Sequence, residues 1–299
     1  MPKIISLFNQ AGGTGKTTLT QNLGYQLAQR GHQVLLVDID PQASLTAFMG
    51  LEPFELTQTI TDSLLKDAPL PIHHDIYGMD LVPANILLSA AEVQLHAAIA
   101  REWRLKQILT PVQDQYEFIL IDCPPTLGVF SILSLVASTH VLVPIQTHFK
   151  AFLGVELLLD SIRQVRERIN PDLAILGVVP VMHEGRTSQG KVILEGIQEQ
   201  LGVVAPIFPA VPSQSRLRML RWSENRWHCT NPGIRLWKYW HRSLRNWRKS
   251  DGCQKDGSGS TQAQDSGCLS GACSGAIYNV GADREDSTAP KATSTLLRC

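Results

Sequence analysis

Short apolar runs recur along the first 212 residues and have the length of buried strands. They are "IISLF" (4–8), "VLLVD" (34–38), "MDLVPA" (79–84), "FILID" (118–122), "HVLVPI" (140–145) and "LAILGVVPV" (173–181). Between them, apolar residues recur every three or four positions over 16–30 and 154–169, which predicts helices. Near-continuous apolar strands need cover on both faces, which the intervening helices supply. The pattern predicts a doubly wound α/β domain with a mostly parallel sheet.

The composition changes after residue 212. Residues 1–212 hold 13 Lys/Arg against 20 Asp/Glu, a net charge of −7, and the remainder holds 14 against 7, a net charge of +7. Five of the six tryptophans and five of the six cysteines also lie beyond residue 212. No apolar stretch reaches the roughly 20 residues that span a bilayer, and the start of the chain lacks the pattern of a secretion signal. We therefore expect a cytoplasmic protein with a domain over 1–212 and a different kind of sequence after it.

A glycine-rich stretch, "AGGTGKTT" (11–18), joins the first predicted strand to the first predicted helix. A loop at this position can direct backbone N–H groups and the positive end of a helix dipole at one anion. Lys16 would then reach the outer phosphates of a nucleotide, and the Thr17 hydroxyl would bind Mg²⁺. The strict Walker pattern has glycine where this chain has Gln10, and glycine-rich loops also occur as plain tight turns. The predicted nucleotide-binding residues are Gly12, Gly13, Thr14, Gly15, Lys16, Thr17 and Thr18.

Three aspartates follow predicted strands on the same side of the sheet. Asp38 and Asp40 lie in "VLLVDIDPQ", and Asp122 lies in "FILIDCPP". Thr17 and Asp122 could hold a nucleotide-bound Mg²⁺, which leaves Asp40 to orient the attacking water. Each aspartate taken alone is equally well explained as a strand-end or helix-capping residue.

The segments "NQAGGTGKTT", "DIDPQ" and "FILIDCPP" together resemble the ParA/MinD family of deviant Walker P-loop ATPases, and more closely its ParA branch. The resemblance covers about residues 1–212 and continues through "VLVPIQ", "VELLLDSI" and "VMHEGRTSQG". It implies a switch that uses ATP and Mg²⁺: ATP joins two subunits into a homodimer, the dimer binds DNA without sequence preference, and a ParB-type partner stimulates hydrolysis. By position, the resemblance implies that the phosphates contact Gly12, Gly13, Gly15 and Lys16. It also implies that Thr17 and Asp38 serve the magnesium site. Asp40 would support hydrolysis, and Asp122 would be the Walker B carboxylate.

The chain departs from the family pattern at position 11. The family has a signature lysine there, which resembles an arginine finger that reaches the partner's phosphates, and this chain has Ala11. Electrostatic clamps of this kind are worth about 10³–10⁵ in rate in phosphoryl transfer. We expect ATP binding through Lys16 to persist and turnover to be weak. A nucleotide-dependent scaffold that does not hydrolyse ATP is the alternative.

Other functions fit the sequence less well. A MinD-like membrane switch would need a C-terminal amphipathic helix, and none is evident, so we expect no membrane partner. An iron–sulfur relative would need paired cysteines in the domain, where Cys123 stands alone. The histidines show no metal-ligand spacing, and His73 and His74 read as part of a polar loop. Because the domain is acidic, DNA contact must be local, and Arg186 and Lys191 are the candidates.

The segment 213–249 is basic and rich in tryptophan, with Glu224 as its one acidic residue. Read directly, it could track and stack on single-stranded nucleic acid, or form a membrane-surface helix with interfacial tryptophans, although its apolar residues keep no sustained helical or strand period. The alternative is a shifted reading frame: one permissible set of codons for 220–230, read two bases on, gives "ALERKPLALY", which resembles the C-terminal part of ParA proteins. Sequencing the coding DNA across codons 205–250 separates the two readings. Residues 250–299 are rich in Gly, Ser, Thr and Ala, so we expect them to be disordered.

Overall fold

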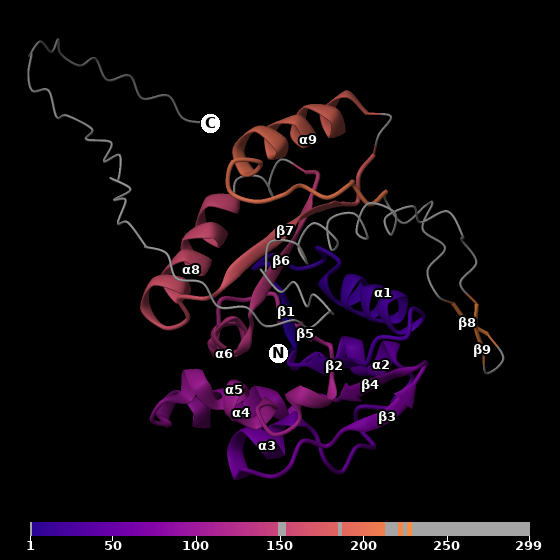
Figure 1. The fold of residues 1–299 in the computed structure, drawn as a ribbon, viewed down its shortest axis with the longest axis vertical. Coiled ribbons are helices and arrows are strands. Elements are labelled where there is room, and N and C mark those ends of the chain that lie inside the picture. The colour runs from indigo at the N-terminus through magenta and orange to yellow at the C-terminus, as the bar shows by residue number, and fades with distance from the viewer. Residues whose placement is uncertain (1, 149–153, 185–186, 213–220, 224–225, 229–299) are drawn as a thin grey trace, which may run out of the picture. The chain divides into compact units, whose positions relative to one another are not determined.

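A central sheet organises the first structural unit of the chain, Met1–Gly252. The computed structural model describes residues 2–148, 154–184, 187–212, 221–223 and 226–228. The sheet has seven strands in the order β3-β4-β2-β5-β1-β6-β7 (Figure 1), and every pairing is parallel except β3 with β4. The strands are β1 (Lys3–Leu7), β2 (Val34–Asp38), β3 (His73–Ile76), β4 (Met79–Val82), β5 (Phe118–Asp122), β6 (His140–Gln146) and β7 (Ala174–Val181).

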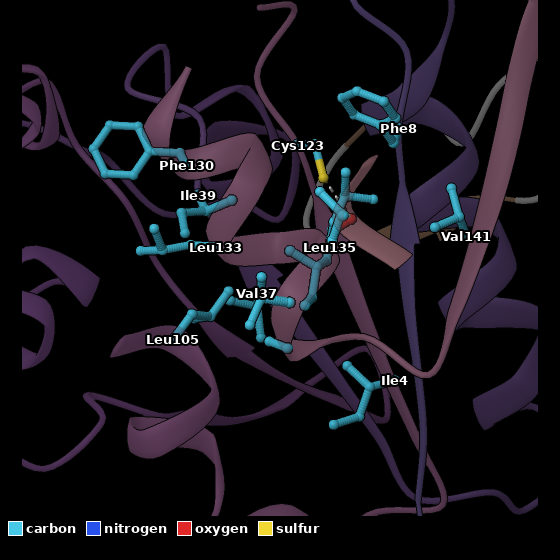
Figure 2. Packing of buried hydrophobic residues seen from close by; sticks show 14 of the residues in the cluster. Ile4, Phe8, Val37, Ile39, Leu105, Cys123, Phe130, Leu133, Leu135 and Val141 are labelled. Carbon is cyan, nitrogen blue, oxygen red and sulfur yellow. Dashed lines mark hydrogen bonds between the residues drawn. The ribbon is translucent and has the colours of Figure 1, made fainter. Parts of the chain in front are cut away.

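Helices cover both faces of this sheet, which confirms the predicted doubly wound α/β fold. The helices α1 (Lys16–Ala28) and α2 (Ser44–Phe48) pack on one face, against side chains such as Leu7 and Leu36. The other face is covered by α3 (Ile60–Lys66), α4 (Leu87–Ala97), α5 (Arg104–Leu109), α6 (Val129–Ala137), α8 (Val155–Arg168) and α9 (Ser188–Leu201), with short 3₁₀ turns η1 (Arg101–Trp103) and η2 (Gln113–Gln115). Figure 2 shows side chains of this second layer, among them Ile4 and Val37 of the sheet and Leu133 and Leu135 of α6.

The polar stretch around His73 forms an edge strand, and the prediction of a loop there was wrong. The strand β3 pairs antiparallel with β4, and Asp80 of β4 holds the hairpin together. Its Oδ1 accepts a hydrogen bond from the Asp75 N–H at 3.0 Å, and its Oδ2 lies 2.7 Å from both His74 Nδ1 and the Tyr116 hydroxyl. An edge strand needs a partner on one side only and commonly carries polar residues, so the apolar pattern of the buried strands is missing here.

The segment 206–212 runs beside β7, although the apolar pattern did not predict it. Phe208 N donates to Val178 O at 2.8 Å, and Val211 N donates to Pro180 O at 2.7 Å. Gly177 permits this approach, because a Cβ there would lie 2.4 Å from the Phe208 ring. The segment thereby brings Val211 and Pro212 to the end of the sheet where the glycine-rich loop lies.

Little of the C-terminal part is described. A short hairpin joins β8 (Arg221–Ser223) to β9 (Arg226–His228), with Trp222 opposite Trp227 in the register. The predictions for the rest of 213–299, including the disorder of 250–299 and the shifted frame, lie outside the described residues. Within the described residues, no helix has the length and apolar character needed to cross a membrane.

Candidate nucleotide-binding site

The glycine-rich loop connects the end of β1 to the start of α1, as the sequence predicts. Gly13 and Gly15 have φ values of 70° and 77°, which glycine adopts without steric cost. Helix α1 begins at Lys16, immediately after Gly15. The first turn of a helix leaves backbone N–H groups without partners inside the helix, so this end of α1 suits an anion.

Two polar side chains that the sequence analysis did not single out hold the loop in place. Asn9 accepts a hydrogen bond from the Ala11 N–H at 2.8 Å and donates to Pro144 O at 2.6 Å. Gln146, at the end of β6, donates from Nε2 to Gly13 O at 2.8 Å. Both residues lie inside the quoted segments "NQAGG" and "VLVPIQ", but the contacts of Asn9 with Pro144 and of Gln146 with Gly13 join positions more than 130 residues apart and leave no local signal.

The Lys16 ammonium group is buried against the loop. Its Nζ donates to Asn9 O at 3.0 Å and to Ala11 O at 3.1 Å. Burial lowers the pKa of Lys16, and the nearby Asp122 and Asp40 carboxylates oppose that shift. A phosphate group placed at the loop would offer this ammonium a charged acceptor in place of two carbonyl oxygens.

Asp38 and Asp122 stand opposite each other at the ends of neighbouring strands β2 and β5, and they have different environments. Asp38 Oδ1 accepts from Asp40 N, and its Oδ2 accepts from both the N–H and the hydroxyl of Thr46. Burial raises the pKa of Asp38 to about 6, against the opposing effect of these hydrogen bonds. Asp122 is fully buried, and neither of its oxygens has a hydrogen-bond partner among the described residues.

The unpartnered carboxylate of Asp122 fits a magnesium ligand. Burial, followed by the charge of Asp38, raises the pKa of Asp122 well above 3.8, and the neighbouring Thr17 hydroxyl opposes that shift. Thr17 and Asp122 therefore lie together, as predicted for the metal site, whereas both oxygens of Asp38 are already occupied by hydrogen bonds. No group of three or more His, Cys, Asp or Glu side chains in the described part of the chain forms a metal cluster. Such a site suits Mg²⁺, which binds through one or two carboxylates together with phosphates and water.

A cavity of about 400 Å³ lies over the loop. Its polar wall comprises Gly13, Thr14, Gly15, Lys16, Thr17, Thr18, Asp40, Gln42 and Ser44, and its apolar wall comprises Leu19, Phe48, Pro125, Val181, Met182, Val211 and Pro212. The volume lies in the range of small-molecule sites. The lining thus combines groups suited to phosphates with apolar side chains suited to a flat apolar group such as a nucleotide base.

Comparison with known proteins agrees with this geometry. The AAA domain family model AAA_31 matches residues 2–175. The sporulation initiation inhibitor protein Soj of Bacillus subtilis is 42% identical over 202 residues, which are 67% of this chain and 80% of Soj. The chromosome partitioning protein ParA of Caulobacter vibrioides is 35% identical over 205 residues, which are 67% of this chain and 77% of that protein. The chain belongs to the ParA/MinD family.

Further relatives of this ParA/MinD-family chain extend the comparison. An uncharacterized protein of Mycobacterium tuberculosis is 41% identical over 204 residues, and the match spans 67% of this chain and 64% of that relative, less than two thirds of its length. One similar solved structure is that of cobyrinic acid a,c-diamide synthase from Mycobacterium smegmatis, which holds an ATP analog and magnesium. It has a TM-score of 0.74 and 31% sequence identity, and the match covers 84% of this chain and 97% of the synthase chain.

The structure brings the phosphate loop, Asp40 and Asp122 of this ParA/MinD-family chain to one place, whereas Lys191, one of the two predicted DNA contacts, lies elsewhere. Lys191 is exposed in the first turn of α9, which the Thr187 side chain caps by accepting a hydrogen bond from Gly190 N at 3.1 Å. It does not line the cavity. Arg186 lies outside the described residues.

Proposed function

We propose that this chain is a ParA-type ATP-binding switch that partitions or positions DNA. One observation carries the proposal: a family glycine-rich loop with a buried lysine faces a cavity beside an unpartnered, fully buried aspartate. The relative named chromosome partitioning protein ParA supports the partitioning role. The structural relative that holds an ATP analog and magnesium supports ATP and Mg²⁺ as the ligands.

The residues of the cavity would share the work of binding and hydrolysis. Lys16 releases the carbonyl oxygens of Asn9 and Ala11 and donates to the outer phosphates, while the glycines permit close approach of the backbone. The Thr17 hydroxyl and Asp122 would hold Mg²⁺, which would supply positive charge against the phosphates. Asp40 accepts a hydrogen bond from the attacking water and orients it toward the terminal phosphate.

The wider assembly follows from the family and is part of the proposal. ATP joins two copies of the chain, the dimer binds DNA without sequence preference through Lys191 and Arg186, and a ParB-type partner stimulates hydrolysis. The protein would be cytoplasmic and associated with the nucleoid. Because the described domain is acidic overall, its affinity for DNA would depend on a few local contacts between cationic side chains and phosphates. Such contacts release counterions, so the affinity should fall with rising salt.

A second candidate is a scaffold that binds ATP without measurable hydrolysis. Ala11 favours it, because Lys16 is the one cationic residue among those that line the described cavity. An arginine or lysine supplied in trans is worth about 10³–10⁵ in rate where it acts on the transferred phosphate.

ATP turnover with saturating DNA decides between the two candidates. We expect the natural chain to bind ATP and hydrolyse it slowly, and Ala11→Lys to raise kcat by about tenfold or more. Lys16→Ala is the matched control for binding, since it removes the phosphate contact and leaves the loop glycines in place. Equal turnover in the natural chain and Ala11→Lys would overturn the role assigned to position 11. Absence of ATP binding in both would overturn the proposed function itself.

A further inference from the structure

The Asp38 carboxylate ties together the two ends of the loop that carries Asp40. At one end, the Asp40 N–H donates to Asp38 Oδ1 at 3.1 Å. At the other end, Thr46 donates to Asp38 Oδ2 twice, from its N–H at 2.8 Å and from its hydroxyl at 2.7 Å. Asp38 and Thr46 are both fully buried, so no water competes for these bonds.

The Thr46 hydroxyl also connects this loop to the next strand. It accepts a hydrogen bond from the Ala84 N–H at 3.0 Å, two residues beyond the end of β4. Its single hydrogen goes to Asp38, so the hydroxyl uses both its donor and an acceptor position. The end of the loop is thus fixed to β2 through Asp38 and to the residues after β4 through Ala84.

Between these two ends the chain makes a tight local turn. Ala43 N donates to Asp40 O at 2.8 Å, and Gln42 N donates to Asp40 Oδ1 at 2.9 Å. Ala43 has a φ of 52°, in the left-handed region that an alanine rarely adopts. The conformation of this turn therefore depends on the hydrogen bonds that attach its two ends to Asp38. Asp40, within the turn, lines the cavity over the glycine-rich loop.

We propose that Thr46 is a positioning residue for ATP hydrolysis, which acts through Asp38 to fix Asp40 relative to the phosphate loop. The catalytic consequence rests on the proposed function, whereas the hydrogen bonds of Asp38 with Thr46 and Asp40 do not depend on it. Thr46 does not line the cavity, so its loss should leave ATP binding intact. A displacement of the water-orienting group by about 1 Å can cost about 100-fold in rate.

Thr46→Val tests the tie, because valine keeps the shape of the side chain and removes the hydroxyl. Thr46→Ser is the rescue variant, since it restores the hydroxyl. Thr139→Val is the matched control. The Thr139 hydroxyl also accepts a hydrogen bond from a backbone N–H, that of Ile4 at 3.1 Å, and donates one to a carbonyl, Ile4 O at 2.9 Å. Thr139 immediately precedes β6, at the opposite end of the sheet from Thr46.

Two measurements are made on the full-length chain. Amide hydrogen exchange without nucleotide measures how firmly the hydrogen bonds between Asp38 and Thr46 hold the loop. We expect Thr46→Val to accelerate exchange over residues 39–46 by about tenfold. Thr46→Ser and Thr139→Val should exchange in that segment at a rate close to that of the natural chain. Steady-state ATP hydrolysis reports the consequence, and we expect kcat to fall by about 10- to 100-fold at unchanged KM in Thr46→Val alone.

Each outcome decides something. Unchanged exchange over 39–46 in Thr46→Val overturns the proposal, whether or not the chain hydrolyses ATP. Accelerated exchange with a kcat equal to that of Thr139→Val shows a structural tie without a catalytic role and also overturns it. If the natural chain binds ATP without hydrolysing it, the hydrolytic form of the proposed function fails, and accelerated exchange still supports the placement of Asp40 by Thr46.

Discussion

Replacement of Asp122 by asparagine should stabilise the nucleotide-free protein at alkaline pH. Asp122 is 0% exposed, and neither carboxylate oxygen has a hydrogen-bond partner among the described residues. Burial, and then the charge of Asp38, raise its pKa well above 3.8. At alkaline pH, folding must bury an unpartnered charge or take up a proton, and both cost free energy. Asparagine removes that cost together with the metal ligand.

The neighbouring Asp38 gives the scale of this effect. It accepts three hydrogen bonds, and burial still raises its pKa from 3.8 to about 6. A difference of roughly two pKa units corresponds to about 3 kcal/mol of ionisation cost at pH 8. Burial raises the pKa of Asp122 well above 3.8 although the Thr17 hydroxyl and the Lys16 charge oppose that shift, so its ionisation cost acts in the same direction, whereas a buried asparagine amide retains about 1 kcal/mol of desolvation cost. We expect a net gain of about 2 kcal/mol and a rise in Tm of about 4–8 °C.

Thermal unfolding followed by circular dichroism at pH 8 and pH 5, without nucleotide, measures this gain. The gain should shrink at pH 5, because the native state then holds Asp122 protonated and the pH lies nearer the pKa of the unfolded chain. Asp114→Asn is the control: Asp114 is exposed, so its replacement should change the free energy of unfolding by less than about 0.5 kcal/mol. A lower Tm for Asp122→Asn at pH 8, or an equal gain at both pH values, would contradict the assignment of Asp122 as a buried, unpartnered charge.

Three further predictions concern the packing around the site. Gly177→Ala places a methyl group 2.4 Å from the Phe208 ring, so urea denaturation should show a loss of about 1–3 kcal/mol, and an unchanged midpoint would contradict the docking of 206–212. Ala43→Gly relieves a left-handed residue but removes a buried methyl group, so the free energy of unfolding should change by less than about 1 kcal/mol, and a larger change in thermal unfolding would contradict this. Burial raises the pKa of Cys123 to about 12, so iodoacetamide at pH 8 should modify it only after unfolding, as peptide mass spectrometry would show.

The sequence predicts those parts of the fold whose burial is uniform along a segment. Strands covered on both faces are apolar throughout, and all six predicted apolar strands exist in the structure. Strand β3 escaped prediction because its polar residues are stabilised by Asp80 and by exposure of the sheet edge. The segment 206–212 escaped because Pro206, Pro209 and Pro212 interrupt it, and proline is tolerated beside a strand only where its missing N–H is not needed.

The site divides in the same way. The phosphate loop could be located from the sequence because its chemistry lies in eight consecutive residues, "AGGTGKTT". The difference between Asp38 and Asp122 could not, because it depends on Thr46 folding back onto Asp38, whereas no group among the described residues lies within hydrogen-bond geometry of the Asp122 oxygens. A motif gives the identity of a carboxylate, whereas its hydrogen-bond partners decide whether it is free to bind a cation.

The order of the strands has a consequence for synthesis of the protein on the ribosome. Strand β1 lies inside the sheet between β5 and β6, where Lys3 pairs with Phe118 and Ile5 pairs with His140, and the cavity wall runs from Gly13 to Pro212. Since a nascent chain emerges from its N-terminus, β1 and the loop after it wait for partners made more than a hundred codons later. Since Val211 and Pro212 line the cavity, its wall is complete only after residue 212 has left the ribosome, and under the proposed function ATP capture would report completion of the domain.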